Sequence, residues 1–139
     1  MHVSEAMHQG VQTIPPTMDV AHIAEIMREQ DIGAVPVADG GRLVGMVTDR
    51  DLALRAVPHL HQKTKLMARD VMSPDIAFCH TEDRLEEAIR KMEIHQVRRL
   101  PVMNADNKIV GMLTIGDLSH AGGRSHMDGL MKSVSQHHS

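Results

Sequence analysis

Apolar residues recur at helical spacing in two separate stretches of the chain. Intervals of three and four residues place such side chains on one face of a helix. The apolar positions are Val20, Ile23, Ile26 and Met27 in the first stretch, and Leu85, Ala88, Ile89 and Met92 in the second. The spacing predicts two amphipathic helices whose apolar faces lie in the core.

The segments around each helix follow the same order of patterns. A short apolar strand follows near Pro36 or Pro101, and a turn rich in Gly, Asn and Asp leads to a second strand, RLVGMVT or KIVGMLT. A further helix starts at DRDLALRAV or IGDLSHA, and a short extended piece, GVQTI or DIAFC, precedes the first helix. The plan β-α-β-β-α, present twice, predicts an α+β fold. Short helical turns, SEAM and ARDVM, are expected to introduce the two copies.

The two halves also repeat residue by residue. The aligned pairs are Met27 and Met92, Pro36 and Pro101, Val37 and Val102, Val44 and Val110, and Thr48 and Thr114. The offset changes by one residue at the hairpin turn, where insertions are tolerated. Because each copy alone would expose an apolar sheet face, we expect the copies to pack through their sheets about a pseudo-two-fold axis.

These patterns predict the domain boundaries. One repeat is expected over residues 7–64 and a second over residues 72–128, with VPHLHQKTK as the linker between them. A tail is expected over residues 129–139, and a helix near residues 126–134.

Composition limits the class of protein. The chain has 139 residues, a net charge of −3, no Trp or Tyr and no basic run, which argues against a nucleic-acid binder. No apolar run approaches the roughly 20 residues that a membrane span needs, and the start MHVSEAMHQG lacks the features of a signal peptide. We therefore expect a cytoplasmic protein with no membrane partner. The single cysteine, Cys79, excludes an intramolecular disulfide and is expected to be a small buried residue.

Each copy carries Thr-x-x-Asp where a strand ends and a helix begins. Thr48 with Asp51, and Thr114 with Asp117, are spaced like a capping box, in which the two side chains bond each other's backbone N–H groups. Helix capping alone would explain these residues, at about 1 kcal/mol for each cap. The alternative is a ligand site, because a helix start attracts anions and a carboxylate accepts hydrogen bonds from the two hydroxyls of a ribose.

A glycine lies three residues before each of these threonines. Gly45 and Gly111 fall in the middle of the predicted strands. A glycine there permits close approach of another backbone or of a ligand.

These motifs resemble a tandem pair of CBS domains, a family named for cystathionine β-synthase, whose paired unit is called a Bateman module. The resemblance rests on aliphatic-Pro-Val followed by Gly-aliphatic-aliphatic-Thr-x-x-Asp-Leu, which occurs twice, and it covers residues 7–128. It implies a non-catalytic regulatory module that binds AMP, ADP, ATP, S-adenosylmethionine or a related molecule in two clefts between the repeats. It also implies a homodimer, and an adenine nucleotide as regulatory ligand with no obligatory cofactor.

The resemblance implies which residues line the clefts. Asp51 and Asp117 would hold ribose hydroxyls, and Thr48 and Thr114 would reach toward phosphate or ribose. Adenine would lie beside the residues before and at each conserved proline, and the early strands would close the pocket. Those further residues are Ala34, Val35, Pro36, Thr13 and Ile14 in the first copy, and Leu100, Pro101, Phe78 and Cys79 in the second.

The two predicted clefts differ in basic side chains. Arg98 and Arg99 precede Leu100 in the second copy, and arginine suits phosphate because its donors form a fork. The first copy has no basic residue there, although Arg50 could substitute. We therefore predict that the second cleft prefers a phosphorylated ligand. The alternative is that both arginines form surface ion pairs with Glu93 or Asp106.

Other chemistry has little support in the sequence. His59 and His61 lie in the linker and His137 and His138 at the tail, without a carboxylate or cysteine cluster at metal-ligand spacing. No nucleophile elbow or P-loop is present, so we expect no catalysis.

Three interpretations of function remain. The preferred one is a sensor whose output passes to an unknown effector protein or across its dimer, because a chain of this length has no room for a fused enzyme. The second is a ligand-free structural or stress-associated interaction protein in which the Thr-x-x-Asp residues are helix caps only. The third is a small metal-dependent enzyme.

Overall fold

Both predicted amphipathic helices are present, and each buries the predicted face. Helix α2 covers Val20–Gln30 and helix α5 covers Leu85–His95, and all eight apolar positions of the sequence pattern are buried. Asp19 begins α2 by accepting a hydrogen bond from the Ala21 N–H at 2.9 Å. Each helix ends at a residue with left-handed backbone, Asp31 or Gln96.

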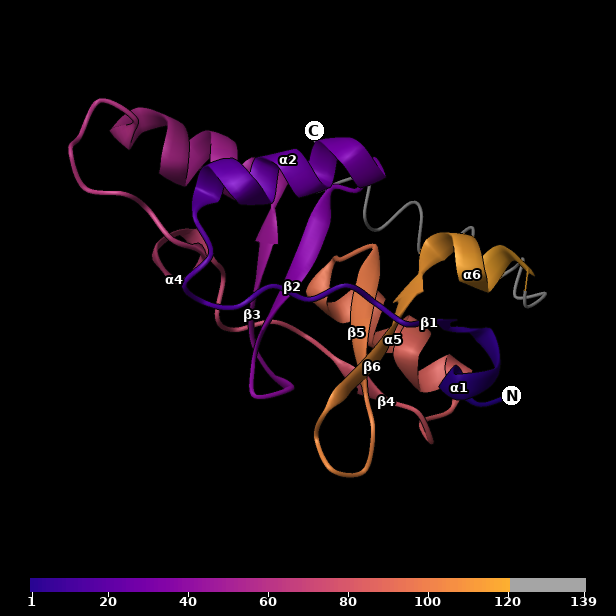
Figure 1. Ribbon diagram of the computed structural model, residues 1–139. Coiled ribbons are helices and arrows are strands. Elements are labelled where there is room, and N and C mark those ends of the chain that lie inside the picture. Colours follow the sequence, from indigo (N-terminus) through magenta and orange to yellow (C-terminus); the bar gives the residue numbers. More distant parts are fainter. Residues whose placement is uncertain (121–139) are drawn as a thin grey trace. The chain divides into compact units, whose positions relative to one another are not determined.

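The computed structural model describes residues 1–120, which fall into two units (Figure 1). The first-copy unit consists of residues 12–76. The second-copy unit consists of residues 1–11 together with residues 77–120.

The first-copy unit is built on an antiparallel hairpin. Its elements are α2, β2 (Ala34–Asp39), β3 (Arg42–Thr48), α3 (Asp49–Asp51), the π-helical turn η1 (Leu52–Ala56), the 3₁₀ turn η2 (Val57–His59) and α4 (Ala68–Val71). The early extended piece GVQTI contributes one parallel bridge, from Ile14 to Val37. On the other edge of the hairpin, Ser73 bridges Met46 in antiparallel fashion.

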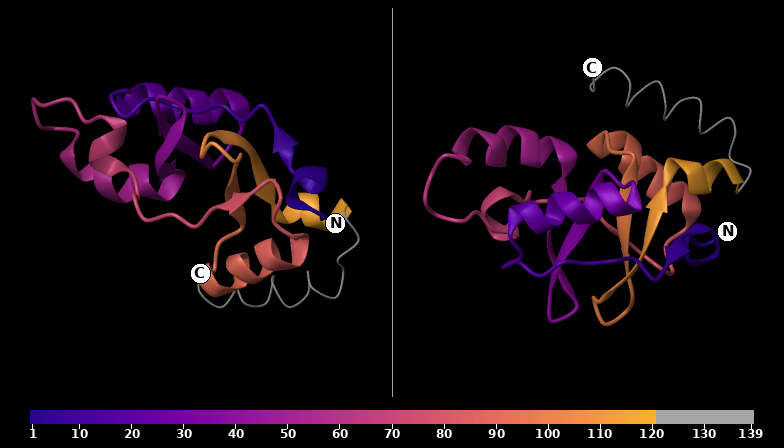
Figure 2. Two further views of the ribbon diagram at one scale, coloured as in Figure 1. Left: turned by 90° about the horizontal axis from the view of Figure 1, so that it is seen from below. Right: turned by 45° about the horizontal axis from the view of Figure 1, so that its top comes forward.

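The second-copy unit repeats this order with longer pairings. Its elements are α1 (Val3–Ala6), β1 (His8–Gln9), β4 (Cys79–His80), α5, β5 (Arg99–Met103), β6 (Ile109–Thr114) and α6 (Ile115–His120). The four strands form one sheet in the order β1-β6-β5-β4. Helix α5 packs against β5 and β6 (Figure 2). The α+β fold class and the doubled β-α-β-β-α plan are therefore confirmed.

Each unit has its own apolar core. In the second-copy unit, Leu100 and Leu113 are fully buried beneath the apolar face of α5. In the first-copy unit, Val35 and Val47 take the equivalent places beneath α2. Because Trp and Tyr are absent, aliphatic side chains and Met fill both cores.

The two introductory helical turns exchange partners. Helix α1 precedes the first copy in the sequence but contacts β4, α5 and α6 of the second-copy unit. Helix α4 precedes the second copy but contacts β3 and η1 of the first-copy unit. Both turns form as predicted, but each packs with the copy that it does not introduce.

The predicted linker is partly helical. Its first three residues form η2, and the residues from Leu60 to Lys65 are exposed and outside any helix or strand. Pro58 has no N–H to donate to the preceding turn, which explains why the helix that starts after β3 ends here. The predicted helix near residues 126–134 and the tail lie outside the described residues.

Gly45 and Gly111 make room for a neighbouring backbone, as the sequence predicts. A Cβ atom on Gly111 would lie against the His8 carbonyl oxygen of β1, closer than real Cβ atoms approach, and 3.0 Å from Met7 Sδ. A Cβ atom on Gly45 would lie 2.5 Å from Met72 Sδ and 3.2 Å from the Ser73 carbonyl oxygen. In both units the close neighbour is the segment that follows the introductory helical turn.

Candidate functional site

The first junction, Thr48 to Asp51, is a complete capping box. Thr48 Oγ1 accepts from the Asp51 N–H at 3.1 Å, and Asp51 Oδ2 accepts from the Thr48 N–H at 2.9 Å. The strand β3 ends at Thr48, and this reciprocal pair starts α3. The capping interpretation of the sequence is therefore confirmed here.

The second junction, Thr114 to Asp117, has the same plan with one additional bond. Asp117 Oδ2 accepts from both the N–H and the hydroxyl of Thr114, at 2.8 and 3.0 Å, and Thr114 Oγ1 lies 3.3 Å from the Asp117 nitrogen. Asp117 is 8% exposed, and it is the one buried charged residue in the described part of the chain. Hydrogen bonds from Thr114 offset the cost of burying this carboxylate.

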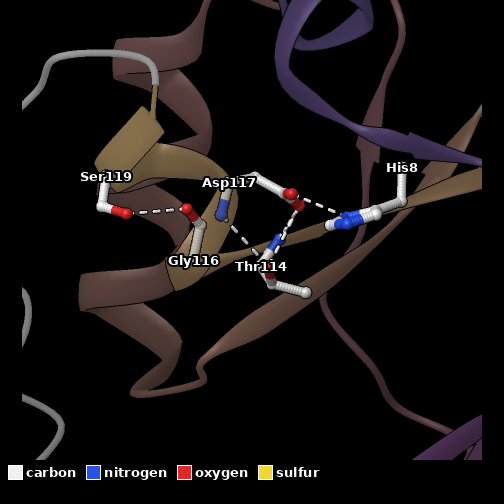
Figure 3. A network of polar contacts seen from close by, with 5 residues as sticks. All are labelled: His8, Thr114, Gly116, Asp117 and Ser119. Carbon is white, nitrogen blue, oxygen red and sulfur yellow. Dashed lines mark hydrogen bonds and ion pairs between the residues drawn. The ribbon is translucent and has the colours of Figure 1, made fainter.

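A residue from the neighbouring segment contacts the other carboxylate oxygen at each junction. His8 Nδ1 lies 2.6 Å from Asp117 Oδ1, and Figure 3 shows the ring on one side of the carboxylate with Thr114 on another. Ser73 Oγ lies 3.4 Å from Asp51 Oδ1. The sequence interpretation missed both residues, although the introductory turns SEAM and ARDVM place His8 and Ser73 at the same offset of 65 residues as Met27 and Met92.

The other first-copy candidates lie close to the first junction. Ala34 pairs with Thr48 in the hairpin register, and Val35 and Pro36 follow it along β2. The Ile14 N–H donates to the Pro36 carbonyl oxygen at 3.0 Å, which brings Thr13 and Ile14 to the same strand. The side chains of Ile14, Val35 and Pro36 are buried, so a ligand at this place would contact mainly their backbone.

The second-copy candidates gather in the same way. Arg99 pairs with Thr114, and Leu100 and Pro101 continue along β5. Cys79 pairs with Val102 on the opposite edge of β5, which places Phe78 and Cys79 near that strand. Each predicted set of site residues therefore lies within one unit.

The arginine side chains differ in exposure. Arg50 and Arg98 are exposed, and Arg99 is partly buried. Among residues 1–120 neither Arg98 nor Arg99 forms an ion pair, so the alternative pairing with Glu93 or Asp106 is not observed. The first-copy positions that match these two arginines are Gly33 and Ala34, which carry no charge.

Cys79 is a buried free thiol, as expected from the sequence. Burial raises the pKa of the thiol to about 12, and the nearby Asp83 carboxylate adds to the increase while Lys91 opposes it. A thiol with this pKa stays protonated near neutral pH and is a poor nucleophile.

This pKa shift predicts a loss of stability in alkali. The unfolded thiol ionises near pH 9, whereas the folded thiol keeps its proton to about pH 12, so stability falls as pH rises between these values. Between pH 8 and 10, the free energy of unfolding of the parent should fall by about 1.4 kcal/mol more than that of Cys79→Ala. Urea unfolding followed by circular dichroism measures both; equal losses would contradict the assignment.

Residues 1–120 contain neither a cluster of metal-ligating side chains nor a membrane-spanning helix. Within that part of the chain, no three His, Cys, Asp or Glu side chains come together as metal ligands. His59 and His61 are exposed, and His137 and His138 lie outside the described residues. No described helix is long and apolar enough to cross a membrane.

Comparison with known proteins places this geometry in context. Residues 3–57 and 68–123 match the family model of the CBS domain. Over 117 residues the chain is 35% identical to the CBS domain-containing protein YhcV of Bacillus subtilis, covering 84% of this chain and 82% of that protein. It is 32% identical to Hypoxic response protein 1 of Mycobacterium tuberculosis over 116 residues, covering 83% and 80% of the two chains.

Solved structures have the same fold. The crystal structure of Hypoxic Response Protein I with two coordinated zinc ions superposes with a TM-score of 0.78 at 30% identity, covering 87% of this chain and 98% of that chain. The crystal structure of CBSX2 in complex with AMP superposes with a TM-score of 0.77 at 29% identity, covering 89% and 97%.

Proposed function

Because this chain belongs to the CBS-domain family, we propose that it is a non-catalytic regulatory module that binds an adenosine-containing ligand at its strand-to-helix junctions. One observation carries the proposal: each junction has a carboxylate with one oxygen committed to the helix cap and a second oxygen outside the cap. A carboxylate oriented in this way can accept hydrogen bonds from ribose hydroxyls. The AMP complex of the similar protein CBSX2 supports adenosine as the ligand class.

The output of such a module depends on a difference in affinity. A ligand changes a conformational equilibrium only if it binds one state more tightly, by about 1–3 kcal/mol in typical allosteric systems. We propose that a homodimer or a separate effector protein receives this change. A cytoplasmic location agrees with the single buried thiol, which needs no oxidising compartment.

A thermal-shift panel tests the proposal. AMP, ATP, NADH and S-adenosylmethionine are added to the full chain, and unfolding is followed by circular dichroism. A ligand at 100 times its dissociation constant should stabilise the protein by roughly 2.7 kcal/mol. Flat melting curves across the panel would favour the ligand-free interaction protein.

That second candidate has an observation in its favour. Both Thr-x-x-Asp pairs form helix-cap hydrogen bonds between their own side chains and backbone N–H groups, which is a sufficient structural role for these residues. Under this interpretation, substitutions at the junctions would lower the stability of the fold, and neither the parent nor the variants would bind an adenosine ligand.

The arginines predict which junction prefers phosphate. Arg99 lies beside Thr114, and a guanidinium group that contacts phosphate forms charge-assisted hydrogen bonds. We expect Arg99→Ala to weaken AMP binding at the second junction about tenfold and to leave adenosine binding unchanged. Isothermal titration calorimetry with both ligands measures this. Arg90→Ala, an exposed arginine on α5, is the control, and an equal loss for AMP and adenosine would contradict the phosphate role.

A further inference from the structure

The two junctions differ most in the residue that contacts the outer carboxylate oxygen. At the second junction this residue is His8, whose side chain is 68% exposed, while the side chain of Asp117 is 7% exposed. An ionised carboxylate can accept hydrogen bonds but cannot donate them. In the contact with ionised Asp117, the His8 nitrogen at 2.6 Å is therefore the donor. The contact is short and charge-assisted, and such bonds are about twice as strong as neutral ones.

The contacts leave Asp117 with few free hydrogen-bond acceptor positions. An ionised carboxylate offers about four acceptor positions. Oδ2 of Asp117 accepts two bonds from Thr114, and Oδ1 accepts the bond from His8. The two neighbouring hydroxyls of a ribose need two acceptor positions, so they cannot both bind Asp117 while His8 stays in place.

Asp51 has more free hydrogen-bond acceptor positions than Asp117. Among residues 1–120, its Oδ2 accepts one bond, from the Thr48 N–H, and its Oδ1 accepts a long bond of 3.4 Å from Ser73 Oγ. A bond of this length is weak, and the hydroxyl hydrogen can rotate toward another acceptor. The first junction can therefore accept a ribose diol without losing a strong contact.

His8 and Ser73 occupy equivalent places in the two units. Each follows the short helical turn, α1 or α4, and each pairs with the methionine that comes after the mid-strand glycine. Those partners are Met112 for His8 and Met46 for Ser73. The difference between the junctions therefore comes from the residue type at one repeated position.

We propose that His8 is a specificity-determining residue: by occupying Asp117, it restricts binding of the ribose diol of an adenosine ligand to the first junction. This inference rests on the proposed function, since it concerns the same ligand. His8 acts as a competing donor: a nucleoside at the second junction must displace it from Asp117. A nucleotide has a compensating contact there, because Arg98 and Arg99 are close to the second junction and can bind its phosphate.

Calorimetry with adenosine, which has the diol but no phosphate, tests the inference on the full chain. The parent should bind adenosine at the first junction. His8→Ser should roughly double the number of adenosine molecules bound per chain, because Asp117 would then contact a weakly bonding serine hydroxyl, as Asp51 does. Ser73→His should weaken adenosine binding at the first junction at least about tenfold. His22→Ser, an exposed histidine on α2, is the control and should leave binding unchanged.

The outcomes separate this inference from the proposed function. If the parent fills both junctions with adenosine, or if His8→Ser leaves stoichiometry and affinity unchanged, the inference is overturned and the proposed function stands. If neither adenosine nor AMP binds the parent or any variant, the proposed function fails and the inference fails with it. His8→Ala, which removes the ring without adding a hydroxyl, is a second variant and should give the same increase as His8→Ser.

Discussion

Replacing Gly111 by alanine should lower the free energy of unfolding by about 3 kcal/mol. The backbone of Gly111 has no positive φ, so the effect comes from space and not from conformation. The new methyl group would overlap the His8 carbonyl oxygen, a backbone atom that can move only if β1 separates from β6. Urea unfolding followed by circular dichroism measures the loss, and hydrogen exchange should speed up at the amides that pair β1 with β6.

Gly45→Ala is the matched control for this prediction. Its closest neighbour is the flexible end of the Met72 side chain, which can rotate away, although the Ser73 carbonyl oxygen lies 3.2 Å from the new atom. We expect a smaller loss, about 1 kcal/mol. Equal losses for Gly45→Ala and Gly111→Ala would contradict the explanation, because the side-chain obstacle would then cost as much as the backbone obstacle.

The largest expected effect on binding follows from Asp51→Asn. The amide keeps the size of the side chain and can still accept the Thr48 N–H, so the cap is largely retained. The loss of negative charge weakens two hydrogen bonds from the ribose diol, each worth about 1.5–3 kcal/mol when the acceptor is charged. Adenosine affinity should therefore fall roughly 100-fold, as measured by calorimetry.

Two controls separate a ligand contact from an effect on the helix. Asp49→Asn, an exposed neighbour whose carboxylate accepts from the adjacent Arg50 N–H, should bind like the parent. The ligand 2′-deoxyadenosine should bind the parent more weakly than adenosine does. This difference should be much smaller for Asp51→Asn, because the 2′-hydroxyl of adenosine then has no charged acceptor. Unchanged adenosine affinity in Asp51→Asn, with a lower melting temperature, would support the interpretation that this residue is only a helix cap.

Much of the fold was predictable because its signals are local. The helical spacing of Val20, Ile23 and Ile26 depends only on which side chains need burial, and all three are buried. The hairpins were predictable for the same reason, since β2 and β3 are joined by a short turn. The Thr48 and Asp51 capping box is also local, because its hydrogen bonds join residues three apart.

The weaker predictions concerned contacts between distant segments. The extended piece GVQTI was predicted as a strand, but it forms one bridge, through Ile14. The extent of this pairing was not predictable, because the partner strand is distant in sequence and local propensity says nothing about their register. The exchange of α1 and α4 between the copies was missed for a similar reason. A four-residue turn has no local signal that selects the sheet edge on which it packs.

The sequence by itself determined the doubled β-α-β-β-α plan, the apolar faces of α2 and α5, and a Thr-x-x-Asp pair at each strand-to-helix junction. Only the tertiary structure decided that His8 contacts Asp117 and Ser73 contacts Asp51, and hence that the two carboxylates differ in free capacity. The physical reason is separation along the chain. Helix periodicity and capping act within a few residues, whereas His8 reaches a carboxylate more than one hundred positions away only after β1 has paired with β6.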